Sequence, residues 1–451
     1  MIFIGIVLFT IYLYVRNYKI PALLLFFFFV TSGFNLIPEE ITKFAFISKG
    51  SDYAFLILIG IIIIDGIFNR GYFNLDNFTK YLILFASFLF ICIFYNKFAI
   101  KLGWSDILRT CRYQFFWLAY FIFRYMPEEA LKTLLKWLFF VTLFTAFLYL
   151  LQIILDKSIL LKANVGYVRL FGYKLSRFYN QPDMLFFFTF MALYQNPLKG
   201  VPKYLSMILL TAALLGAFHR SLIGTFIFTV FVGYIISFPY LKRIYFLSIT
   251  SIILLFTIVF MGFKFVDSRT YSDVKMVMSG NLTDMEIDVE DLQQSTFTFR
   301  ILHLLERNQY LMEHRRAMIF GAGLIPEDSK LVDKMFDFKI GLVEELTGVT
   351  NQLETSDISY SNLLLRLGYV GTFLYLLLIV YLLVFFYKKR NNDYGLFSFL
   401  YLILSIGVSF FSANLTQPIT FLMPLISYNI IKKSDSQKIA NETMESTKNE
   451  K

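Results

Sequence analysis

Charged residues are scarce in this sequence: they form 16% of its 451 residues, whereas a soluble domain carries about 25%. Hydrophobic residues form 57% of the chain and include 55 Phe. They lie in continuous runs long enough for a helix to cross a hydrocarbon core of about 30 Å. The alternation of apolar and polar residues typical of membrane barrels is missing. The composition therefore excludes a soluble domain and a barrel, and predicts an all-α polytopic membrane protein.

Cysteine is also rare, with only two residues, Cys92 and Cys111, in or beside predicted spans. They form neither a disulfide framework nor a metal-type spacing. No Ser-His-Asp, zinc or nucleotide-loop pattern is present. The acidic stretch 279–295 resembles a calcium loop only superficially, since Val289 and Ser295 replace the Gly and Glu that such a loop needs. A solvated acidic loop is the better interpretation, and we expect no metal and no cofactor.

The apolar blocks between charged residues predict about 12–13 spans, among them 107–124, 243–263 and 358–387. The first run, MIFIGIVLFTIYLYV, lacks a basic start and a small-residue cleavage site, which predicts a retained span. The prediction divides the chain into four parts. These are a transmembrane bundle at 1–263 with a small external loop at 156–182, a large external loop at 264–357, C-terminal transmembrane helices at 358–431 and a disordered cytoplasmic tail at 432–451.

The distribution of charge explains the net charge of +10. The large loop holds 17 acidic and 10 basic residues, which leaves 15 acidic and 32 basic residues elsewhere. Every second connection between spans is short and rich in Lys and Arg, as cytoplasmic connections are. The excess of positive charge is therefore a signal of topology, and we expect no nucleic-acid partner.

Basic side chains gather on the predicted external side. A helix from Ser295 or Thr296 to about Met318 would place three of them on one face. Two more lie in a connection so short that both must be at the membrane boundary, where ionisable residues usually bind something or line a cavity. The small loop adds a further pair. The set comprises Arg169, Arg177, His219, Arg220, Arg300, His303 and Arg307. The alternatives are a solvated helix stripe, side chains that reach out to the membrane surface, and ordinary loop charges.

Two carboxylates, Glu354 and Asp357, lie beside these residues just before the span that contains Gly371. Guanidinium groups bind phosphate in a forked geometry that Lys cannot offer. A cationic pocket beside a carboxylate suits a lipid-anchored diphosphate. The arginines would stabilise the departing diphosphate while the carboxylate takes a proton from an attacking hydroxyl.

Four segments in this order resemble bacterial O-antigen ligases and O-antigen or capsular polysaccharide polymerases (the Wzy/WaaL type). RLFGYKLSRFYNQPD resembles the family's Arg–Gly–Asn loop, and FHRSLIGTF resembles its Ser-Arg-Gly membrane motif. FRILHLLERNQYL, followed by IFGAG, resembles its Arg-containing loop helix, and DISYSNLLLRLGYVG resembles its His-Asn-x-Tyr-Leu…Gly-x-x-Gly segment. The resemblance covers about residues 160–375 and implies a GT-C-like membrane glycosyltransferase that needs neither a nucleotide sugar nor a metal.

The resemblance also implies roles for residues. Arg220 and Arg300 match the two arginines that contact the lipid diphosphate. Asp357 lies where the ligases have their catalytic histidine, with Tyr360 in step, and this departure favours a polymerase. His303 and Glu354 are alternative bases.

The expected reaction transfers glycan from an undecaprenyl-diphosphate carrier onto a lipid-linked repeat unit, at the outer face of a bacterial inner membrane. The expected partners are this lipid-linked oligosaccharide, membrane lipids and a chain-length regulator protein. A ligase that moves polymer to lipid A-core, and a flippase of lipid-linked sugars, are the alternatives. The large one-sided loop and the lack of inverted halves disfavour the flippase.

Overall fold

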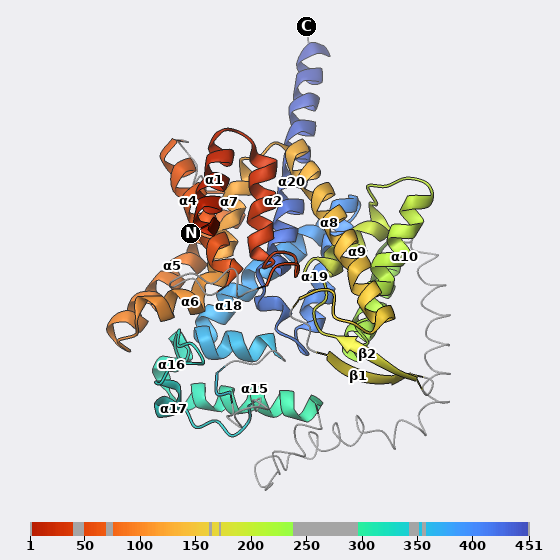
Figure 1. The fold of residues 1–451 in the computed structure, drawn as a ribbon. Coiled ribbons are helices and arrows are strands. Elements are labelled where there is room, and N and C mark those ends of the chain that lie inside the picture. Colours follow the sequence, from red (N-terminus) through yellow and green to blue (C-terminus); the bar gives the residue numbers. More distant parts are fainter. Residues whose placement is uncertain are drawn as a thin grey trace.

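The computed structural model describes residues 2–38, 49–68, 75–161, 165–170, 173–237, 296–341, 351–353 and 358–449. Most of this part is helical (Figure 1). By length and composition, four helices in it can cross a membrane: α4 (Gly50–Phe68), α5 (Asn77–Phe98), α8 (Glu128–Leu155) and α18 (Ser359–Lys388). The prediction of a helical membrane protein is confirmed at this level.

Shorter apolar helices complete the bundle. They are α1 (Ile2–Val15), α2 (Lys19–Val30), α9 (Leu185–Tyr194), α10 (Val201–Leu215), α11 (Arg220–Ser237) and α19 (Asp393–Val408). The predicted span 107–124 is broken into α6 (Trp104–Phe115), the 3₁₀ turn η1 (Phe116–Leu118) and α7 (Ala119–Arg124). The first of these pieces is half polar and amphipathic, which suits a membrane surface better than its interior. The predicted span 243–263 lies outside the described residues.

Large apolar side chains lie both inside the bundle and on its outer surface. Inside, Trp117 stacks on Phe421 with ring centroids 4.3 Å apart. Outside, Ile63 and Phe373 are 54% and 64% exposed. Lipid tails are as apolar as these side chains, so a membrane accommodates a surface that water would penalise.

The bundle has two distinct ends (Figure 1). Helix α20 (Pro418–Asn449) projects from one of them, which we call the tail end, while β1, β2 and α15 lie at the opposite loop end. At the tail end, Lys433 Nζ donates to the Arg124 carbonyl at 2.7 Å, and Lys389 pairs with Asp435 at 2.9 Å. Helix α20 also continues through 432–449, where the sequence predicts disorder; this stretch contains no Gly or Pro to interrupt a helix.

The small loop 156–182 contains a two-stranded hairpin within an otherwise helical fold. Strand β1 (Val165–Leu170) pairs antiparallel with β2 (Tyr173–Phe178). Both strands are short and carry β-branched and aromatic residues, which favour an extended backbone. The hairpin lies at the loop end of the bundle, and its second strand contains Arg177.

Two glycines lock the large-loop helices onto the bundle. Helices α15 (Thr296–Glu313) and α16 (Arg315–Phe320) pack against α18, and Ala322 N donates to the Leu365 carbonyl at 2.7 Å. At the crossing, Gly321 has φ +74° and ψ −174°, and Gly368 has φ 65° and ψ −172°. Only Gly adopts this backbone region readily. A Cβ on Gly368 would lie 2.7 Å from Gly321 N, so the two backbones cross without room for a side chain.

Candidate functional site

Three basic side chains from separate elements meet at the loop end. Arg177 is the penultimate residue of β2, His219 immediately precedes α11, and Arg300 lies in the second turn of α15. Burial, together with the positive charges of Arg177 and Arg300, lowers the pKa of His219 to about 4. Both guanidinium groups are therefore close enough to repel a proton from this imidazole. We call these three residues the basic cluster.

Aromatic rings and one carbonyl hold the arginines of the basic cluster. Arg177 Nε donates to the Ala217 carbonyl at 3.0 Å, and its guanidinium lies 4.5 Å from the centre of the Tyr179 ring. The Arg300 guanidinium lies 5.3 Å from the centre of the Phe411 ring. Among the described residues, no carboxylate pairs with Arg177. The cluster therefore presents positive charge, and the Nη groups of Arg177 can donate to an anion.

His219 is held as a neutral imidazole. Its Nδ1 lies 2.7 Å from Ser221 Oγ and 3.4 Å from the backbone N of Leu222. A backbone N–H can only donate, so Nδ1 is the acceptor and the ring hydrogen is on Nε2. With its lowered pKa, His219 offers a neutral N–H donor next to two guanidinium groups.

Four predicted site residues cannot be placed at the level of side chains. Arg220 is the first residue of α11, and Arg169 lies opposite Lys174 in the hairpin, but both side chains lie outside the described part. Glu354 and Asp357 lie outside the described residues altogether.

His303 and Arg307, on the same helix as Arg300, are buried against α18 and the loop after α16. His303 is 1% exposed and its Nδ1 lies 2.8 Å from Ser361 Oγ. Burial and, to a lesser extent, the charge of Arg307 lower the pKa of His303 to about 3. Arg307 is completely buried; it pairs with Glu306 and donates to the Gln352 carbonyl at 2.9 Å. These contacts fix α15 in place, so both side chains position Arg300 instead of facing a ligand.

The polar residues at the start of α18 make contacts within the protein. Ser359 Oγ donates to the Ser412 carbonyl at 2.8 Å, and Tyr360 Oη donates to the Ile406 carbonyl at 3.0 Å. Together with the bond between Ser361 and His303, these contacts join the start of α18 to α15 and to the end of α19. The polar residues therefore assemble the loop end where three helices meet.

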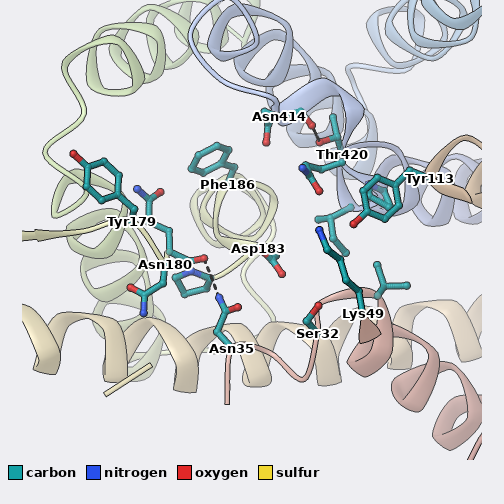
Figure 2. A pocket seen from close by; sticks show the side chains of 16 residues that line it. Ser32, Asn35, Lys49, Tyr113, Tyr179, Asn180, Asp183, Phe186, Asn414 and Thr420 are labelled. Carbon is teal, nitrogen blue, oxygen red and sulfur yellow. Dashed lines mark hydrogen bonds between the residues drawn. The ribbon is translucent and has the colours of Figure 1, made fainter. Parts of the chain in front are cut away.

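A polar cavity of about 350 Å³ is lined in part by the residues that follow β2 and by the connection between α19 and α20 (Figure 2). We call it the amide pocket, because five carboxamide side chains line it: Asn35, Asn180, Gln181, Asn414 and Gln417. Tyr179, Phe186, Lys49 and Asp183 also line it. The sequence analysis did not identify this pocket. The available signal was the interruption of apolar sequence by polar residues in YNQPD (179–183) and SANLTQP (412–418).

The comparisons with known proteins leave the site to be interpreted from its own chemistry: no protein-family model and no curated protein matches the chain.

Proposed function

We propose that the protein is a membrane glycosyltransferase that uses a glycan on a lipid-linked diphosphate as donor. The preferred reaction is polymerisation, in which a growing glycan leaves its undecaprenyl-diphosphate carrier and joins the next lipid-linked repeat unit. The loop end would then face outward from a bacterial cytoplasmic membrane, on a fold of the GT-C kind. The basic cluster is the observation that carries this proposal.

The cluster is costly for the protein alone. Arg177 and Arg300 come from segments far apart in sequence, and their positive charges add to the effect of burial in lowering the pKa of His219 to about 4. Basic side chains gathered at a membrane boundary usually bind a ligand or line a cavity, and a ligand that suits them is an anion. A diphosphate supplies several oxygen acceptors for the guanidinium forks and for His219 Nε2. Its lipid tail would lie against the apolar surface of the bundle.

The reaction can be written with the residues of this chain. The hydroxyl oxygen of the acceptor sugar attacks the anomeric carbon of the donor, and the bond from that carbon to the diphosphate oxygen breaks. Arg177 and Arg300 stabilise the charge that develops on the departing diphosphate. Asp357, two residues before α18, is the proposed base that receives the hydroxyl proton. Attack opposite the leaving group inverts the anomeric configuration.

The test uses a deletion strain complemented with variants of the gene. Arg300→Ala and Arg177→Ala should insert normally and lose long polysaccharide chains, with a rate about 100- to 1,000-fold lower, because a donor to the leaving group is missing. Arg316→Ala is the matched control, since this arginine is exposed on α16. Wild-type ladders of chain length in Arg300→Ala would contradict the proposal. Intact polymer accumulating on the carrier in the deletion strain would instead indicate a ligase.

A further inference from the structure

We propose that the amide pocket is a subsite for the glycan part of the substrate, an uncharged chain rich in hydroxyl groups. This inference rests on the proposed function, because it places the sugars next to the diphosphate held by the basic cluster. It adds a ligand-binding site that the sequence motifs did not indicate.

The lining of the pocket matches hydroxyl groups. A carboxamide donates and accepts at once, and so does a sugar hydroxyl, whereas a phosphate only accepts. Asn414 Nδ2 is buried and makes no hydrogen bond within the described part of the chain. Gln417 is exposed at the pocket, and its side chain has no hydrogen-bond partner in that same part. Figure 2 shows the Phe186 ring in the pocket below Asn414, with Tyr179 at its side. Aromatic rings like these offer apolar faces for a sugar ring.

Other amides build the wall. Asn180 is 5% exposed; its Oδ1 accepts from Gln152 Nε2 at 2.8 Å and its Nδ2 donates to the Leu160 carbonyl at 2.8 Å. Asn35 Nδ2 donates to the Gln181 carbonyl at 3.4 Å. The pocket is thus a fixed frame that leaves Asn414 and Gln417 for a ligand.

Charge separates the pocket from the basic cluster. The charged residues that line the pocket are Lys49 and Asp183, one of each sign. The basic cluster contributes two arginines and a neutral histidine. The positive charge therefore attracts a diphosphate to the basic cluster, and an uncharged sugar enters the amide pocket without an electrostatic penalty. A volume of about 350 Å³ lies within the range of about 300–1,000 Å³ that is usual for small-molecule sites.

Two segments run from one site to the other. Arg177 of the basic cluster is two residues before Tyr179, which lines the pocket and lies under the Arg177 guanidinium. Phe411, which contacts Arg300, is three residues before Asn414. An extended chain covers at most about 3.5 Å per residue, so the two segments span at most about 7 and 11 Å. Sugars attached to a diphosphate in the cluster are therefore within reach of the pocket.

The experiment measures two properties of purified protein in lipid vesicles. One is binding of undecaprenyl diphosphate, which carries no sugar, and the other is transfer of glycan between lipid-linked chains. The double variant Asn414→Leu/Gln417→Leu should bind undecaprenyl diphosphate as the wild type does. Its KM for a glycan substrate should rise about 30-fold, as expected for two lost hydrogen bonds. Gln309→Leu, an exposed amide on α15, is the matched control.

The concentrations of growing chain and of repeat unit are varied separately. A rise in KM for the repeat unit assigns the pocket to the acceptor, and a rise for the growing chain assigns it to the donor. Unchanged KM values for both, or loss of undecaprenyl diphosphate binding in the double variant, would overturn the glycan subsite. Failure of the proposed function looks different: the wild-type protein would neither bind undecaprenyl diphosphate nor transfer glycan.

Discussion

Replacing Gly368 by Ala should destabilise the protein strongly, because the crossing between α16 and α18 has no space for a side chain. The Cβ of an alanine at this position would lie 2.7 Å from Gly321 N and 2.7 Å from the Ile319 carbonyl carbon. It would also force a non-glycine residue to keep φ at 65° and ψ at −172°. The strain costs about 1–3 kcal/mol, and the overpacking costs a further 1–3 kcal/mol or so. The expected loss of stability is therefore about 2–6 kcal/mol.

Gly321→Ala should give a similar loss, since its Cβ would lie 2.5 Å from the Leu365 carbonyl oxygen. The effects of the two substitutions on stability should not add, because both create strain at the same crossing. Gly224→Ala is the control: this glycine lies in α11, where a Cβ would have no neighbour within 4 Å. A helical Gly→Ala change there should be neutral or stabilise by up to about 1 kcal/mol.

The assay is thermal unfolding in detergent, followed by circular dichroism, combined with undecaprenyl diphosphate binding at a temperature where each variant is folded. Both substitutions at the crossing should lower the melting temperature. They should also weaken binding, because the crossing sets the position of α15 and hence of Arg300. A Gly368→Ala protein with the same melting temperature as the Gly224→Ala protein would refute the reasoning.

Two further predictions concern the buried face of α15. The pKa of His303 is lowered to about 3, below its unfolded value of about 6.5. The contribution of His303 to stability is therefore fully present above pH 6.5, and the free energy of unfolding falls by about 2 kcal/mol at pH 5. His303→Asn should remove this part of the acid decline in melting temperature, whereas the exposed His314→Asn should leave it; equal slopes in all three proteins would contradict the burial argument. Arg307→Ala should cost about 1–3 kcal/mol, because it removes the hydrogen bond to the Gln352 carbonyl and the pair with Glu306. Limited proteolysis of this variant should then cut near residues 336–341. The control Arg315→Ala, which changes an exposed arginine, should resist cleavage there, and equal cleavage in the two variants would count against the role of the Arg307–Glu306 pair.

The sequence predicted the helix around Arg300 but not which of its basic residues would face a ligand. Helical spacing puts Arg300, His303 and Arg307 on one face. Packing against α18 then buries His303, and the loop after α16 buries Arg307. Helical periodicity contains no information about that partner helix, so the distinction could not be made from sequence.

The amide pocket was missed for a related reason. Asn180 and Asn414 are far apart in the chain, and each alone reads as a polar residue at a helix boundary. Only the packing of the hairpin exit against the connection between α19 and α20 makes them neighbours in one cavity. The hairpin itself was missed because its alternating pattern is only six residues long in each strand, too short to outweigh the interpretation of a loop.

Helix α20 begins at Pro418 in the wall of the amide pocket and continues beyond the far side of the bundle (Figure 1). At 1.5 Å per residue its 32 residues measure about 48 Å. One continuous helix therefore connects the amide pocket with the tail end of the bundle. A small displacement of Gln417 or Thr420 when the cavity fills would therefore reach the projecting segment, and a protein gripping that segment could sense or restrain the arrival of each sugar chain.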